Sequence, residues 1–183
     1  IDASGFYELA WQPGPPSLTV TTDENLLAHI TTRVTGDKLE IDLDGAMAPS
    51  DGIKVVVTSP ELTTVELSGA LEFEAKSLAG AKFSLDTSGA AKVTLAGKIG
   101  RLLANLTGAS KLVAADLQAE DVELSVTGAG KADVTATNSL KAAIPGPGNG
   151  GAGGSPQSGE RKPARAAHPR PPTPPEGREA RRD

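Results

Sequence analysis

Few side chains in this sequence have the types and spacing that catalysis requires. Its 183 residues include two histidines and no cysteine, which excludes thiol chemistry, disulfides and cysteine-based metal sites. His29 stands alone in an early segment, and His168 lies in a stretch rich in Pro and Arg. No Ser-His-Asp arrangement is suggested, and neither a Gly-x-Ser-x-Gly elbow nor a phosphate-binding Gly-x-x-x-x-Gly-Lys loop occurs. We therefore expect no catalytic residue and no cofactor.

Acidic side chains form the next candidate group. Asp42 with Asp44, and Glu72 with Glu74, are two positions apart, so each pair would share one face of a strand and could hold a hard cation such as calcium. The other interior aspartates occupy no common position of the repeat described below: Asp86, Asp116, Asp121 and Asp133. A solvated acidic face explains the same residues, and we predict no metal site.

Three lysines recur at one position of a repeat. Lys92, Lys111 and Lys131 each stand three residues after a glycine, and Glu72 holds the same position one repeat earlier. On one outward face they would form a cationic strip that could bind an anionic glycan or surface polymer. The ordinary interpretation is a solvated face that discourages association between strand edges. These lysines are the candidate binding residues.

A Ser/Thr-Gly-Ala phrase repeats along the middle of the chain, at 68–70, 88–90, 107–109 and 127–129, with a degenerate copy at 145–147. Its glycines are 20, 19, 20 and 18 residues apart: Gly69, Gly89, Gly108, Gly128 and Gly146. A period of this size indicates a stacked repeat. Apolar and polar residues alternate on both sides of each glycine, which is typical of strands with one buried face.

Equivalent positions of the repeat are mostly apolar. The position four residues after the glycine is occupied by Phe73, Val93, Leu112 and Ala132, and the position two before it by Leu67, Thr87, Leu106 and Val126. Parallel strands would stack these residues about 4.8 Å apart, and successive coils would share one interior. The predicted fold is all-β: a single-stranded parallel β-helix, or β-solenoid, with coils of about 20 residues.

The glycine column is expected to mark a corner that only a residue without Cβ can occupy. One residue before it stand hydroxyl side chains: Ser68, Ser88, Thr107 and Thr127. We expect these to form a corner hydrogen-bonding ladder with the backbone. The alternative is an ordered hydroxyl array that binds ice or sugar, although ice binding would need a second parallel column.

Residues 1–62 precede the clear repeats and are expected to cap the first coil as an irregular block. Strands are predicted at 5–11, 18–21 and 54–58, and a hairpin at 31–34 and 38–43 around Gly36 and Asp37. Residues 23–30 change to a helical spacing, with Asp23 as the expected cap. Residues 1–148 are taken as one β-helix domain, with the repeated coils at 63–148.

Residues 149–183 are predicted to be a disordered tail, because they are rich in Pro, Arg and Gly and nearly lack large apolar residues. Their basic residues are sparse and mixed with acids, so no nucleic acid partner is expected. The chain has a net charge of −5 and no apolar run long enough for a transmembrane segment. It begins at Ile1 rather than Met, so we expect that a leader has been lost.

Three phrases in order, at 23–27, 54–62 and 65–70, resemble the bacterial auto-transporter adhesin family that carries the head GIN domain, a domain of unknown function. The resemblance covers about residues 1–144. It implies a right-handed β-helix on exported proteins with a signal sequence or lipid anchor, and it carries over no catalytic or binding residue. Family members continue with further coils, whereas 144–148 and 154–156 look like remnants here. A shifted reading frame or genuine decay would leave the last coil open.

The sequence therefore favours a non-enzymatic β-solenoid of the cell envelope, acting as an adhesin or as a surface or periplasmic binding module. Its partner is expected to be an unidentified envelope component such as a glycan, and its location exported, periplasmic or at the cell surface. One alternative is a carbohydrate-active β-helix enzyme of the polysaccharide-lyase type. Another is a scaffold that self-associates through the open ends of the solenoid.

Overall fold

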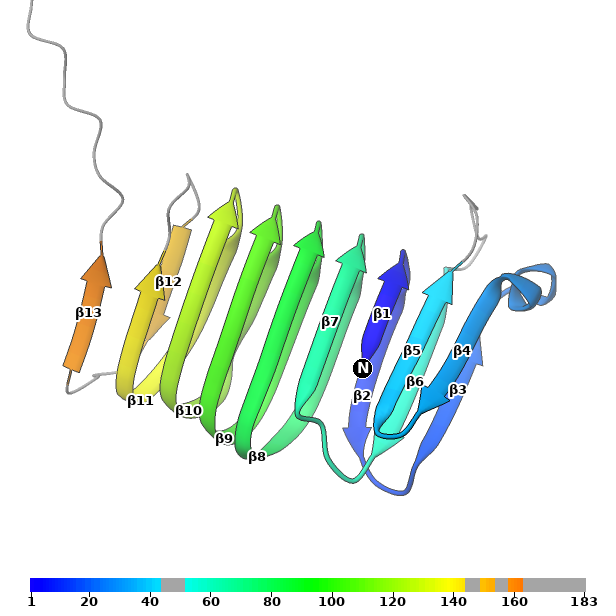
Figure 1. The fold of residues 1–183 in the computed structure, drawn as a ribbon, viewed down its shortest axis with the longest axis horizontal. Helices are drawn as coiled ribbons and strands as arrows, with labels where there is room; N and C mark the ends of the chain where they lie inside the picture. The colour runs from blue at the N-terminus through cyan, green and yellow to red at the C-terminus, as the bar shows by residue number, and fades with distance from the viewer. Residues whose placement is uncertain (44–51, 144–148, 154–157, 163–183) are drawn as a thin grey trace, which may run out of the picture.

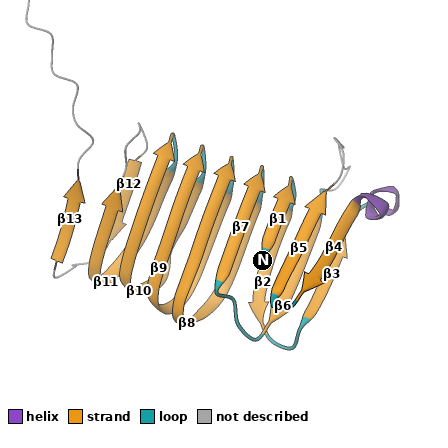
Figure 2. Ribbon diagram, viewed as in Figure 1, coloured by secondary structure: helices purple, strands orange, loops and turns teal. Residues whose placement is uncertain are grey.

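The protein is a wound β-sheet, shown in Figures 1 and 2. The computed structural model describes residues 1–43, 52–143, 149–153 and 158–162. The predicted remnants at 144–148 and 154–156, together with Asp44, Gly146 and His168, lie outside the described residues. No helix in the described part of the chain is long and apolar enough to cross a bilayer.

Thirteen strands and one 3₁₀ helix make up the described fold. In chain order they are β1 (Asp2–Gly5), β2 (Glu8–Pro13), β3 (Ser17–Thr21), η1 (Glu24–His29), β4 (Ile30–Thr35), β5 (Lys38–Leu43), β6 (Lys54–Ser59), β7 (Thr64–Gly69), β8 (Glu72–Gly89), β9 (Lys92–Gly108), β10 (Lys111–Gly128), β11 (Lys131–Ala143), β12 (Asn149–Gly153) and β13 (Ser158–Lys162). In Figure 1 the chain climbs one face, turns at the top and descends the other. We call these the near face, with β1, β5 and β7, and the far face, with β2 and β6.

Parallel pairing confirms the predicted β-solenoid. β7, β8, β9, β10 and β11 stack in chain order, and the glycine column is in register from Gly69 to Gly128. The column that begins at Phe73 is in register with Val93, Leu112 and Ala132, and all four side chains are buried. The period-two alternation therefore fills one continuous interior, as the sequence predicted.

The N-terminal residues are built differently from the prediction. The expected strand at 5–11 is confirmed only for 8–11, because Gly5 ends β1 and β2 begins at Glu8. Gly5 is in register with Gly69 and thus belongs to the glycine column. β1 pairs with both β5 and β7, and β2 with both β6 and β8. The first coil of the chain therefore lies between the β5–β6 coil and the β7–β8 coil.

A terminal layer covers the outer side of the β5–β6 coil. β4 pairs antiparallel with β5, as the predicted hairpin requires, and β3 pairs antiparallel with β6. The predicted helix is the 3₁₀ helix η1, the purple element in Figure 2, and Asp23 is its N-cap residue. η1 links β3 to β4, and Leu26 within it is buried. Residues 17–35 thus cover this end of the core.

Segments predicted to be disordered extend the other end. β12 and β13 lie within the predicted tail and pair parallel with β11. Disorder of the tail as a whole stays a prediction. Strand pairing uses backbone groups, which glycine and serine supply as well as other residues. The rest of the predicted tail, 163–183, lies outside the described residues.

The interior contains few polar atoms. The buried Tyr7 hydroxyl donates to the Ile41 carbonyl oxygen at 3.0 Å, and burial raises its pKa. Trp11 Nε1 donates to Ser59 Oγ at 2.8 Å. Thr87, in the column of Leu67 and Leu106, is 3% exposed and its Oγ1 has no hydrogen-bond partner in the described structure.

Candidate functional site

The glycine column forms one edge of the solenoid, which we call the glycine turn. Gly69, Gly89, Gly108 and Gly128 have φ values of +109°, +113°, +96° and +112°. A Cβ on Gly89 would lie 2.5 Å from the Gly69 carbonyl oxygen. That oxygen accepts a hydrogen bond from the Ala90 N–H at 2.9 Å. The turn is therefore a stacked backbone ladder, which the predicted corner column required.

The residues just before these glycines form a hydroxyl row on the near face. Ser4, Ser68, Ser88, Thr107 and Thr127 occupy consecutive register positions. The last four are exposed, and none donates or accepts a side-chain hydrogen bond with another described residue. The predicted hydrogen-bonding ladder is therefore wrong. The turn carbonyls already accept the alanine N–H groups, so these hydroxyls face solvent.

Two positions earlier on the same face lies a second row, which we call the acid–amide row. It contains Glu40, Asp2, Glu66, Asp86 and Asn105, in consecutive register positions. Asn105 Nδ2 donates to Asp86 Oδ1 at 2.7 Å. Between this row and the hydroxyl row lies a shallow depression of about 360 Å³. Ligands placed there would meet carboxylates on one side and hydroxyls on the other.

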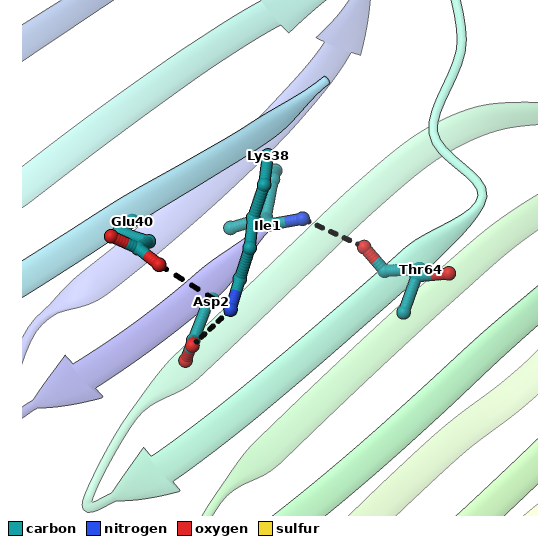
Figure 3. Close-up of polar contacts among 5 residues, drawn as sticks. All are labelled: Ile1, Asp2, Lys38, Glu40 and Thr64. Atoms are coloured by element: carbon teal, nitrogen blue, oxygen red, sulfur yellow. Dashed lines mark hydrogen bonds and ion pairs between the residues drawn. The ribbon is translucent and has the colours of Figure 1, made fainter. Parts of the chain in front are cut away.

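One end of the acid–amide row carries a cation (Figure 3). Lys38 Nζ lies 2.9 Å from Asp2 Oδ2 and 3.5 Å from Glu40 Oε1. The hydrogen bond to Asp2 raises the pKa of Lys38. The Ile1 nitrogen donates to the Thr64 carbonyl oxygen at 2.8 Å, which joins β1 to β7. Two of the carboxylates are thus partly neutralised, whereas Glu66 and Asp86 make no ion pair in the described structure.

The predicted lysine column lies on the far face. Lys92, Lys111 and Lys131 are in consecutive register positions, and Glu72 lies beside Lys92 in the same column, one coil earlier. Lys92 forms an ion pair with Glu72, which raises its pKa through the shared hydrogen bond. Lys111 and Lys131 are exposed and have no ion-pair partner among the described residues. A binding role for the column stays a prediction.

The remaining predicted acidic residues are dispersed. Glu74 and Glu72, which could have held a cation together, have separate partners: Glu74 forms an ion pair with Lys76 at 2.9 Å, and Glu72 with Lys92. Asp121 accepts hydrogen bonds from Ser139 Oγ at 2.7 Å and Asn138 Nδ2 at 2.9 Å, which lower its pKa. Within the described residues no three His, Asp or Glu side chains come together as a metal site. His29 is exposed at the end of η1.

Sequence reasoning missed the acid–amide row. The sequence repeat alone places Glu66, Asp86 and Asn105 at one position, three residues before a glycine. Asp2 and Glu40 join them only because β1 and β5 continue the near face out of chain order. A 20-residue period carries no information on such neighbours. The one available signal was Ser4-Gly5, a partial copy of the repeated phrase.

The fold and these faces define a β-solenoid protein with flat, polar, repetitive surfaces. The family model described as "Putative auto-transporter adhesin, head GIN domain" matches residues 12–156, and the chain belongs to this family. No curated protein matches the chain.

Solved structures share the fold. A "putative adhesin" from Bacteroides fragilis is similar with a TM-score of 0.70 and 22% identity, covering 86% of this chain and 84% of that one. Another from Parabacteroides merdae is similar with a TM-score of 0.50 and 20% identity, covering 88% and 86%.

Proposed function

We propose that this protein is a non-catalytic binding module of the cell envelope, and that the near face binds a glycan without net negative charge. The family's description as an adhesin supports a binding role. The observation that carries the choice of face is the hydroxyl row, five hydroxyl-bearing residues in register whose side chains are unpartnered within the described structure. Their spacing of about 4.8 Å is set by strand pairing.

A row of prealigned hydroxyl-bearing residues suits a repetitive polyol. The backbone of each residue is fixed by a strand of the solenoid, so only short side chains have to be ordered when a ligand forms several hydrogen bonds. The acid–amide row alongside adds acceptors that sugar hydroxyls can donate to. The same carboxylates repel an anionic polymer, so the near face selects neutral or amino-substituted glycans. Anionic glycans would bind to the far face, beside Lys111 and Lys131.

A binding assay that compares the two faces tests the proposal. Ser88→Arg/Thr107→Arg places bulky side chains on the hydroxyl row, and Lys111→Gln/Lys131→Gln is the matched far-face control. The protein and both variants would be titrated against neutral and anionic envelope polysaccharides by biolayer interferometry. We expect the near-face variant to lose about tenfold or more in affinity for the neutral polysaccharide, equivalent to 1.4 kcal/mol, and the control to keep it.

Two outcomes would contradict this proposal. Binding of anionic polysaccharide alone, lost in the lysine variant, would transfer the site to the far face. Absence of binding to every envelope polysaccharide would remove the glycan role. Circular dichroism of each variant checks that the solenoid is intact.

A further inference from the structure

The terminal layer leaves two strand edges without partners among the described residues. β4 pairs only with β5, and β3 pairs only with β6. The two edges lie on opposite faces of the same end of the solenoid, at the right of Figure 1. Unpaired N–H and C=O groups on such edges are templates for another strand. A partner that satisfies both edges must itself present two strands at the spacing of this fold.

Usual protections against edge pairing are sparse here. Arg33 is the only charged residue in β3 and β4, and neither strand contains proline. Val34 points toward the interior side of β4, opposite Leu39, yet it is 71% exposed. Leu18 and Val20 of β3 are likewise only partly buried. The terminal layer that covers the core therefore leaves apolar atoms of its own inward side chains facing solvent.

We propose that this end is a self-association surface, where two copies stack through β3 and β4 to form one longer solenoid. A second copy presents two edges at the required separation. A two-fold axis running from the near to the far face would pair β4 antiparallel with the partner's β4, and β3 with the partner's β3. Such an interface is isologous, with the same patch used twice.

The sequence of β4 is self-complementary about Thr32. Directly opposite residues of an antiparallel pair lie on the same side of the sheet, so only registers centred on a residue are allowed. Centring on Thr32 places Val34 opposite Ile30 of the other copy, and Arg33 opposite Thr31. Centring on Arg33 would bring two guanidinium groups together, which like-charge repulsion disfavours. The register about Thr32 thus buries the exposed valine and separates the arginines.

β3 has the same property about Thr19. That centre places Leu18 opposite Val20 of the other copy and Ser17 opposite Thr21. Both inward residues, Leu18 and Val20, already face the buried strand β6. The second strand pair would therefore extend the far face and its interior together.

One axis serves both centres. Thr32 aligns with Ile41 and through it with Ala3, whereas Thr19 aligns with Val56 and through it with Ala10. Ala3 and Ala10 stand three residues before and four residues after Phe6, in the turn between β1 and β2. The two centres are thus at nearly the same height on the two faces.

The expected complex is weak. Strands of six residues are about 20 Å long and the two faces about 10 Å apart, which gives a contact area on the order of 200 Å² per copy. This is below the usual size of specific interfaces. We therefore expect a concentration-dependent dimer with a Kd in the micromolar range or above.

Cross-linking through an introduced cysteine tests the register, because the chain contains no other cysteine. Thr32→Cys would face its own symmetry mate, at a Cα separation of about 5 Å that suits a disulfide. Thr19→Cys would do the same on the far face. Thr35→Cys is the matched control, because its symmetry mate would be about 20 Å away. We expect the first two variants to form disulfide-linked dimers at least about tenfold faster than the control under mild oxidation.

Sedimentation equilibrium of the full chain supplies the second measurement. Val34→Lys is expected to weaken association about tenfold or more, because a lysine would face Ile30 of the other copy. Ala79→Lys, at an exposed position of β8 in the middle of the stack, is expected to change the Kd less than twofold. A chain that is monomeric at millimolar concentration, or equal cross-linking at positions 32 and 35, overturns the proposal. Dimers that Val34→Lys leaves unchanged also overturn it.

Discussion

Each repeated coil turns twice, and the two turns are built by different means. At the glycine turn the backbone of one coil bonds directly to the backbone of the next, as in Ala90 N–H to Gly69 O and Ala109 N–H to Gly89 O. No register shift occurs there between β8, β9 and β10. This turn excludes side chains, because a Cβ added to any of these glycines would lie 2.3 to 2.6 Å from the glycine carbonyl oxygen of the neighbouring coil.

The opposite turn, which we call the variable bend, comprises 76–77 in β8, 96 in β9 and 115–116 in β10. All three long strand pairs shift register there. β8 has two residues where β9 has one, which accounts for repeat lengths of 20 and 19. Differences in length between coils are therefore absorbed at the variable bend.

Side chains replace backbone pairing at and beside the variable bend. Thr135 Oγ1 donates to the Ala115 carbonyl oxygen and Thr137 Oγ1 to that of Ala119, each at 3.2 Å. Asp121 accepts from the two residues of β11 that lie beside it. These contacts differ from coil to coil, so the bend needs no sequence repeat. Because the glycine turn keeps the coils in register, the coils can differ in length and in contacts at the variable bend.

The largest expected effect on stability is that of a one-residue insertion, and its size depends on which of the two turns receives it. One alanine inserted between Ala90 and Ala91 shifts the following strand by one position, which turns its inward side chains outward. We expect a loss of about 4 kcal/mol or more of the free energy of unfolding. The same insertion between Ala96 and Gly97 only restores the 20-residue length, and should cost about 1 kcal/mol or less.

Urea unfolding followed by circular dichroism measures both insertions. Equal losses at the two positions would mean that the variable bend is as constrained as the glycine turn.

A single methyl group at the glycine turn should have the next largest effect. Gly89→Ala combines a φ of +113° with a Cβ 2.5 Å from the Gly69 carbonyl oxygen, so we expect a loss of about 3 kcal/mol. Gly36→Ala is the control, since Gly36 has a φ of +60° but open space around its Cβ position. It should cost about 1 kcal/mol. Thermal unfolding of the two variants would show whether crowding adds to backbone strain; similar losses would assign the whole cost to strain.

A smaller effect, of opposite sign, is expected beside the glycine turn. Thr87→Val keeps the shape of a fully buried side chain and removes an Oγ1 without a partner. Removing the desolvation cost of that hydroxyl should increase stability by about 1 to 2 kcal/mol. A decrease in the midpoint of urea unfolding would show that Thr87 Oγ1 is satisfied in solution.

The smallest expected effect is electrostatic and lies beside the variable bend. The hydrogen bonds from Ser139 and Asn138 hold the pKa of Asp121 below its ordinary value. Their contribution to stability is therefore present at neutral pH and lost as the pH falls through the lowered pKa. Ser139→Ala should raise the pKa of Asp121, so that this loss begins at higher pH. Carboxyl ¹³C chemical shifts followed during a pH titration measure it, and an unchanged pKa would contradict the assigned cause.

The fold of the repeated coils could be predicted because consecutive coils are also neighbours in space. A residue such as Phe73 has its partner 20 positions later, and a period reveals it. The position of β1 could not be predicted in this way, because its neighbours β5 and β7 begin 36 and 62 residues after Asp2. Gly5 is followed by Phe6 and Tyr7 instead of alanine, so the phrase that marks the turn is incomplete there.

The candidate sites were predictable to different degrees. The alignment of Lys92, Lys111 and Lys131 follows from the period alone. The role of Ser88 and its equivalents did not, because it depends on whether the turn carbonyls are free. Those oxygens already accept backbone N–H groups, a fact of three-dimensional geometry that side-chain type does not encode.

The position of β1 also bears on how the chain is assembled. β1 leaves the ribosome before the two strands that flank it, β5 and β7, have been synthesised. Until residue 75 has been made, the apolar side chains of residues 2–13 lack the neighbours on one side that will bury them. The C-terminal coils can add to the solenoid one after another as they are synthesised. The N-terminal strands β1 and β2 can complete their packing only after β7 and β8 have been made.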